Sequence, residues 1–107
     1  MKTIENRFIP FKGFKAINIF GVVFVREGMT MKPRDYNHEA IHTAQMKELC
    51  YISFYIIYFF EWLYYLIRKR SWKRAYRAIS FEREAFANQS NYHYLENREP
   101  FAQWRKK

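Results

Sequence analysis

The pattern of apolar positions changes at Pro33, from a strand-like run before it to helix-like segments after it. The run from Ala16 to Val25 (AINIFGVVFV) is rich in β-branched and aromatic residues, which is typical of a strand. Gly21 within this run predicts a bend or a bulge. Met29-Thr30-Met31 is expected to return antiparallel to it, which makes a small hairpin with its turn at Arg26-Glu27-Gly28.

The rest of the chain lacks helix breakers. No glycine follows Gly28, and no proline lies between Pro33 and Pro100. Because this stretch also shows little two-residue alternation, it predicts helices joined by tight turns. We expect three helices, at residues 36–49, 50–70 and 72–95. Asp35 is the expected N-cap of the first helix, and Ser71 that of the third.

These elements predict one α+β domain over residues 1–107. Its parts are a β-rich lead-in (1–34), a helical core (35–97) and a tail (98–107). Residues 1–12 are expected to be irregular, with a short edge strand as an alternative. The tail is expected to pack loosely or to fray.

Composition and charge narrow the class of protein. The 107 residues suffice for one modest core, and 50% hydrophobic content exceeds that of disordered chains. The single cysteine, Cys50, excludes an internal disulfide and a cysteine-rich zinc site. The net charge of +9 favours an anionic partner. The first ten residues lack a secretory signal, so we expect an unprocessed cytoplasmic chain, with membrane association as an alternative.

The expected second helix is unusually aromatic. Its segment CYISFYIIYFFEWLYYLI carries a single formal charge, Glu61, and approaches the length of about 20 residues that spans a membrane. Five tyrosines, Ser53 and Glu61 make it a poor lipid-facing span. One interpretation is therefore burial against the other helices, and the other is contact with a membrane surface. A basic cluster directly follows: Arg68, Lys69, Arg70, Lys73, Arg74 and Arg77. Nucleic-acid binding is the weakest alternative, because no nucleic-acid motif accompanies this cluster.

One motif carries candidate chemistry: His38-Glu39-Ala40-Ile41-His42 has the pattern H-E-x-x-H. On a helix, His38 and His42 lie one turn apart on the same face, so both imidazoles can bind one metal ion. A carboxylate beside them that does not bind the metal can take a proton from water. The motif predicts a Zn²⁺ centre with Glu39 as general base. The alternative is a surface helix with two ordinary histidines.

A zinc centre with two histidines needs a third protein ligand, and a carboxylate from a later helix is one solution. The expected third helix carries Glu82 and Glu84. These two residues lie roughly 200° apart around a helix axis, so only one of them can face the metal.

The H-E-x-x-H motif followed by a glutamate on a later helix resembles the pattern of the gluzincins, which are metallopeptidases with H-E-x-x-H on one helix and a glutamate on a later one. Thermolysin-like enzymes, membrane-bound prenyl-protein peptidases and the very small minigluzincins share this plan. In several of these families the glutamate helix has the pattern E-x-x-A-D or E-x-x-A-N, which places the glutamate at Glu82 and the small residue at Ala85. Phe86 departs from the pattern, because in the relatives an Asp or Asn here supports a zinc-binding histidine. Asn88, Asn37 or a backbone carbonyl are the alternatives for that role.

The resemblance implies a zinc-dependent metallopeptidase that acts on peptides or proteins. Its ligands would be His38, His42 and Glu82, with Glu39 as the catalytic base. An extended substrate would pair with the strand at residues 16–25. The alternative is a non-catalytic zincin-like binding protein, associated with a membrane surface through its aromatic helix and basic cluster.

Further polar residues are candidates for supporting roles. Gln45, one turn beyond His42, either orients a ligand or is an ordinary exposed helix residue. Tyr36, Tyr92 and His93 are candidate donors to the oxyanion that develops during amide hydrolysis.

Overall fold

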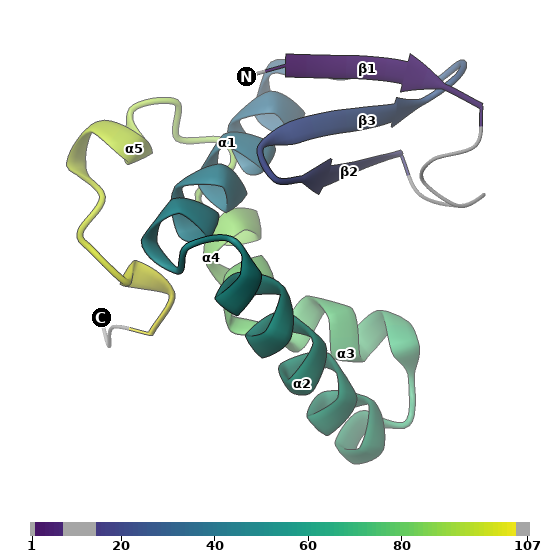
Figure 1. The fold of residues 1–107 in the computed structure, drawn as a ribbon, viewed down its shortest axis with the longest axis vertical. Coiled ribbons are helices and arrows are strands. Elements are labelled where there is room, and N and C mark those ends of the chain that lie inside the picture. Colours follow the sequence, from purple (N-terminus) through teal and green to yellow (C-terminus); the bar gives the residue numbers. More distant parts are fainter. Residues whose placement is uncertain (1, 8–14, 105–107) are drawn as a thin grey trace.

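A three-stranded sheet lies beside a set of helices in the computed structural model, which describes residues 2–7 and 15–104 (Figure 1). The strands are β1 (Lys2–Asn6), β2 (Ala16–Ile19) and β3 (Val22–Arg26), in the order β1-β3-β2. β3 pairs antiparallel with β2 and parallel with β1. β2 is therefore an edge strand. The predicted α+β class, mostly helical with a small N-terminal sheet, is confirmed.

The hairpin differs from its prediction. The run expected as one strand folds back on itself at Phe20-Gly21, where Ile19 pairs with Val22. Both turn residues have positive φ, 51° and 88°, as a two-residue hairpin turn of type I′ requires. Gly21 was therefore a turn signal and not a bend within a strand. Met29-Thr30-Met31 forms no strand, because the turn after Arg26 leads directly into the first helix.

The stretch predicted to be irregular, residues 1–12, contains the strand β1. β1 pairs with β3 from Lys2 with Val22 to Asn6 with Arg26, so the alternative of an edge strand holds. Residues 8–12 of this stretch lie outside the described residues.

In the described part of the chain, five α-helices and one short 3₁₀ turn follow the sheet (Figure 1). They are α1 (Pro33–Glu48), α2 (Ile52–Lys69), α3 (Trp72–Ala78), α4 (Ser80–Asn88), α5 (Tyr94–Asn97) and the 3₁₀ turn η1 (Ala102–Trp104). α1 begins earlier than predicted, at Pro33, a residue suited to the first helical position. Asp35 is therefore not the N-cap. Its carboxylate accepts a hydrogen bond from the backbone N–H of Lys32 at 2.8 Å, which still satisfies a free donor at the helix start.

The predicted third helix is broken at Ile79. This buried residue has extended backbone angles (φ −57°, ψ 134°), which end α3 and let α4 start in a new direction. The Glu61 carboxylate of α2 accepts hydrogen bonds from Ser80 N–H and Ser80 Oγ–H at 2.8 and 2.7 Å. Glu61 thus acts as an N-terminal cap supplied by another helix.

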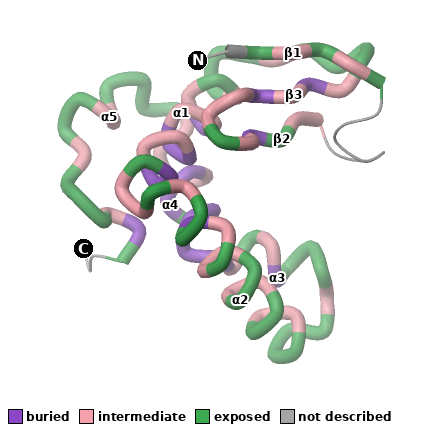
Figure 2. Tube along the Cα trace, in the orientation of Figure 1, coloured by how far each residue is buried: buried purple, intermediate pink, exposed green. Residues whose placement is uncertain are grey.

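The core lies where α4 meets α1 and the start of α2 (Figure 2). Met46, Phe54, Ile79 and Phe81 form its cluster, each at most 3% exposed. Ala85 is fully buried on α4, and its small side chain permits the close approach of α4 to α1. Phe54 is the only α2 residue in the buried class, so that helix keeps an exposed face.

Among the described residues, no single helix is long and apolar enough to cross a membrane. Only α1 and α2 together, bent by 112° at their junction, have the length and composition of a span.

The tail is docked, which corrects the prediction that it is loose. The Arg98 side chain is 6% exposed and forms ion pairs with Glu84 and Glu48. Trp104 Nε1 donates a hydrogen bond to Ser80 Oγ at 3.1 Å. Residues 98–104 therefore close one side of the α1–α4 pair, while residues 105–107 lie outside the described part.

We predict that Arg98→Met lowers the free energy of unfolding by about 3 kcal/mol, because it leaves the buried Glu84 carboxylate without its partner. Urea denaturation followed by circular dichroism measures this change. The matched control is Arg7→Met, which removes an ion pair with Glu27 whose side chains are 71% and 56% exposed. The control is expected to show no measurable change. Equal stability of the two variants would contradict the docking of the tail.

Candidate metal centre

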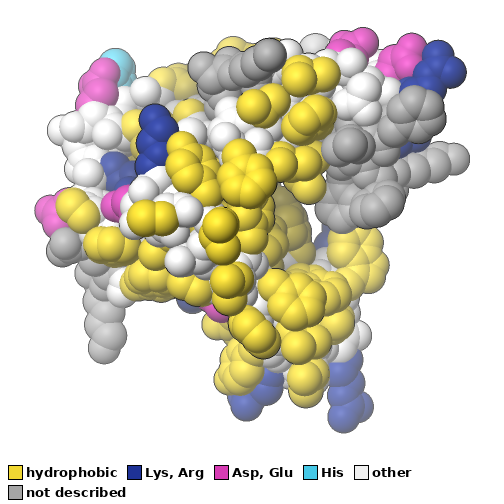
Figure 3. Space-filling view, viewed as in Figure 1, with side chains coloured by type: hydrophobic (Ala, Val, Ile, Leu, Met, Phe, Trp, Pro, Cys, Tyr) yellow, Lys and Arg dark blue, Asp and Glu magenta, His cyan; other side chains and the backbone are white. Residues whose placement is uncertain are grey.

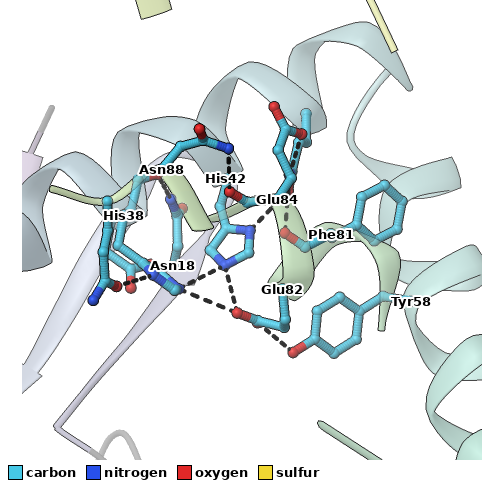
Figure 4. Close-up of polar contacts among 11 residues, drawn as sticks. Asn18, His38, His42, Tyr58, Phe81, Glu82, Glu84 and Asn88 are labelled. Carbon is cyan, nitrogen blue, oxygen red and sulfur yellow. Dashed lines mark hydrogen bonds and ion pairs between the residues drawn. The ribbon is translucent and has the colours of Figure 1, made fainter. Parts of the chain in front are cut away.

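Three buried side chains from two helices converge on one point (Figure 4). α1 presents His38 and His42 one turn apart, and α4 crosses it and brings Glu82 opposite them. Glu82 Oε1 lies 3.1 Å from His38 Nε2 and 3.0 Å from His42 Nε2, and the two imidazole nitrogens are 3.1 Å apart. Each residue is at most 7% exposed.

The amide of Gln45 determines the state of His42. Its nitrogen donates to the Phe81 carbonyl at 3.0 Å and to Glu84 Oε1 at 2.8 Å, and both of these groups are acceptors only. The Gln45 oxygen must therefore face His42 Nδ1, which lies 2.8 Å away and must carry the proton. This leaves the Nε2 of His42 directed at Glu82.

Gln89 determines the tautomer of His38 in the same way. Its Oε1 lies 2.8 Å from His38 Nδ1, so Nδ1 is the donor and Nε2 again faces Glu82. Because a hydrogen bond on the second nitrogen fixes both tautomer and ring orientation, Gln45 and Gln89 are a matched pair of supports. Gln89 is not among the residues predicted from the sequence, although it follows Glu82 by seven residues and thus lies two turns along the same face.

Asn37, one of the residues proposed as a substitute for the missing polar side chain, has another role. Asn37 Nδ2 donates to the carbonyl oxygens of Asn88, Gln89 and Asn91, at 3.3, 2.8 and 3.0 Å. These bonds hold the end of α4 against the start of α1. Phe86 packs its ring edge-to-face on His38, with the ring centres 4.5 Å apart.

The resulting donor set favours a positive charge at its centre, which a proton or a metal ion can supply. With both Nδ1 atoms donating to glutamines, the Nε2 atoms of both histidines and one carboxylate oxygen face each other at about 3 Å. Burial lowers the pKa of His42, but the adjacent Glu82 carboxylate outweighs it and raises this pKa to about 9. Burial alone raises the pKa of Glu82, but His42 and the hydrogen bonds from both histidines hold it well below its usual range.

These atoms suit a zinc ion. Two imidazole nitrogens and a carboxylate oxygen are a ligand set found in catalytic zinc sites, which keep a fourth position open. Ligands about 2.0–2.1 Å from one tetrahedral ion lie about 3.3 Å from each other, close to the separations of 3.0–3.1 Å found here. The second oxygen of Glu82 accepts a hydrogen bond from Tyr58 at 2.6 Å, which directs the first toward the histidines.

Glu84 lies outside this group. Its carboxylate accepts hydrogen bonds from Gln45, Tyr94 and Arg98. Burial raises the pKa of Glu84, but these donors outweigh it and lower the pKa overall. Of the two glutamates that the sequence offered, Glu82 faces the histidines and Glu84 supports Gln45 behind them.

Glu39 opens onto a cavity of about 500 Å³ that His38, His42 and Glu82 also line. Burial raises the pKa of the Glu39 carboxyl. Aromatic residues from the two following helices form much of the remaining wall: Phe54, Tyr55, Tyr58, Phe59, Trp62, Trp72 and Tyr76.

The edge strand β2 forms another wall of the same cavity through Ala16, Ile17 and Asn18. Asn18 fixes the strand to α1, because its Nδ2 donates to the Glu39 carbonyl and to Thr43 Oγ1, both at 2.9 Å.

The three residues considered as oxyanion donors do not line this cavity. Tyr36 and Tyr92 are 41% and 58% exposed, and the side chain of His93 is 79% exposed beside Glu96. The phenols that reach the cavity are Tyr55, Tyr58 and Tyr76.

Comparison with known protein families, with curated proteins and with solved structures gives no match to this chain.

We predict that the wild-type protein retains one equivalent of zinc after dialysis, that Glu82→Gln loses it, and that Glu84→Gln keeps it. The reason is that a neutral amide replaces a charged ligand in the first variant and only a support in the second. Elemental analysis measures the metal content of all three. Zinc retained by Glu82→Gln, or lost equally by Glu84→Gln, would contradict the site.

We predict that Gln89→Leu weakens zinc binding by about 10–100-fold, because His38 Nδ1 loses its acceptor. Competition against a chromophoric chelator measures the affinity. Gln89→Glu keeps an acceptor oxygen and is expected to stay near the wild-type value. If both variants bind zinc as the wild type does, Gln89 does not orient the histidine.

Proposed function

We propose that this chain is a zinc-dependent metallopeptidase of the gluzincin type. The observation that carries the proposal is that Glu39, the His38/His42/Glu82 group and the edge strand β2 all face one cavity. These are the parts that amide hydrolysis needs: a metal-binding group, a general base and a surface that holds an extended peptide.

Each residue of the proposed site has a separate role in the reaction. His38 and His42 bind through Nε2 while their Nδ1–H groups stay on the two glutamines. Zinc held by these histidines and Glu82 supplies Lewis-acid chemistry, which acidifies water and polarises a peptide carbonyl. Glu39 takes the proton from the attacking water on its carboxylate and passes it to the nitrogen of the leaving amine. Its raised pKa brings it closer to neutral pH, where a general base works best.

The cavity also indicates how a substrate would lie. The outer edge of β2 can pair with an extended peptide through backbone hydrogen bonds. At the Phe20 end of this strand the backbone is already occupied, because the Tyr55 hydroxyl accepts a hydrogen bond from the Phe20 N–H at 2.8 Å and donates one to the Asn18 carbonyl at 3.2 Å. We therefore propose that the peptide pairs with the Ala16 end of the strand. The aromatic walls favour an apolar side chain in the cavity.

The second candidate function is a non-catalytic zinc-binding protein. The observation that favours it is Phe86, an apolar residue packed on His38 where the gluzincin pattern has a polar one. Gln89 weakens this argument, because it bonds to the same histidine.

We predict that Glu39→Gln lowers peptide hydrolysis at least 100-fold while zinc content stays at the wild-type level, because the amide cannot accept the proton. Cleavage of a mixed peptide library followed by mass spectrometry measures the activity. The matched control is Glu96→Gln, a carboxylate whose side chain is 71% exposed and outside the cavity. The control is expected to cleave at the wild-type rate.

Two results would overturn the proposal. Wild-type protein with one equivalent of zinc that cleaves no peptide would favour the non-catalytic function. Cleavage at an equal rate by wild type and Glu39→Gln would show that this glutamate is not the base.

A further inference from the structure

One face of α2 is apolar and open to solvent. Seven large side chains on this helix are between 37% and 70% exposed: Ile52, Ile56, Phe59, Phe60, Leu63, Tyr64 and Ile67. At 100° per residue they fall within an arc of about 140°, so they form one continuous stripe. Figure 3 shows apolar side chains covering this side of the molecule. We call this set the α2 stripe. A stripe of this size exceeds the scattered exposure that is normal for a soluble surface.

The opposite face of α2 packs against the rest of the protein. Phe54 is buried in the core, Tyr58 bonds to Glu82, and Glu61 caps α4 through Ser80. Glu61 is the only acidic residue of α2, and it points away from the stripe. The stripe therefore carries no negative charge.

Cations surround the end of the same helix. Six exposed basic residues lie on the last turn of α2, the connection to α3 and α3 itself: Arg68, Lys69, Arg70, Lys73, Arg74 and Arg77. Across residues 2–7 and 15–104, none of the six forms a salt bridge. Lys69, Lys73, Arg74 and Arg77, together with Arg83, also line an open groove of about 1150 Å³ that has no acidic residue in its wall. We call the six residues the basic end.

We propose that the α2–α3 hairpin binds the surface of an anionic lipid bilayer. The α2 stripe enters the boundary between headgroups and acyl chains, and the basic end contacts the lipid phosphates. An amphipathic helix with one apolar face and nearby cations has the chemistry of an interfacial anchor. This inference does not depend on the proposed peptidase activity.

Charge complementarity favours a bilayer over a second copy of the chain as the occupant. Two stripes packed together would bury apolar area, but neither brings a carboxylate to the basic end of the other. An anionic bilayer meets the stripe with acyl chains and the basic end with phosphates at the same time. The net charge of +9 adds long-range attraction to such a surface.

The test is co-sedimentation of the purified full chain with vesicles. One set is phosphatidylcholine alone and the other is an equimolar mixture with phosphatidylserine. We expect binding to the anionic vesicles that weakens steeply as salt increases. Ile56→Ser with Phe60→Ser should weaken this binding by about tenfold or more, because both side chains lose their burial in lipid.

The charge variant is Lys73→Glu with Arg74→Glu. A glutamate three residues after the N-cap Ser71 completes a capping box, so loss of α3 cannot explain a loss of binding. We expect binding to fall roughly 25-fold, about fivefold for each lost cation. The control is Arg34→Glu with Lys47→Glu, which changes the net charge equally on exposed positions of α1. Vesicle binding by this control variant should fall less than about threefold, because local contact with the lipid matters more than net charge.

Either of two results would overturn the inference. The first is no binding to anionic vesicles, or binding that is the same for both lipid compositions and insensitive to salt. The second is a dimer in sedimentation velocity that Phe60→Ser dissociates, without vesicle binding by the wild type, which would make a second copy the occupant.

Discussion

The buried amide of Gln45 connects one histidine of the candidate centre to α4 and, through Glu84, to the docked tail. It connects α1 to α4 through the Phe81 carbonyl, and it fixes the proton of His42 on Nδ1. Its orientation depends on the Glu84 carboxylate, which Arg98 in turn keeps charged. A chain of hydrogen bonds thus runs from the docked tail to the imidazole. Because each group in it is nearly or fully buried, removal of one member leaves another polar group without a partner, which is costly.

The orientation of the two imidazoles and of Glu82 explains why a positive charge is stabilised at the centre. The glutamines force both imidazoles to present Nε2, and Tyr58 directs the free oxygen of Glu82 to the same point. Without a metal ion, His42 holds a proton there, which its raised pKa reflects. A zinc ion competes with that proton for the same nitrogen. The cavity beside the group is also lined by Glu39 and by the edge of β2, which in the proposed peptidase would serve as the general base and as the surface that holds the peptide.

The sequence predicts what local patterns control. The apolar run before Pro33 and the breaker-free chain after it give the α+β class, and the spacing of H-E-x-x-H puts both histidines on one helical face. Features that depend on distant partners escape such reasoning. The helix break at Ile79 is stabilised by Glu61 of another helix, and the docking of the tail depends on Arg98 finding two carboxylates far away in sequence. Gln89 was missed because glutamine is common on helices, and only contact with His38 reveals its role.

The most direct test of the central claim is X-ray absorption spectroscopy at the zinc edge on the zinc-loaded protein. We expect one first shell of nitrogen and oxygen at about 2.0–2.1 Å, with the scattering signature of two imidazoles and no sulphur. The imidazole signature should weaken in His42→Ala. A shell that contains sulphur from Cys50, or one without histidine scattering, would contradict a centre formed by His38, His42 and Glu82.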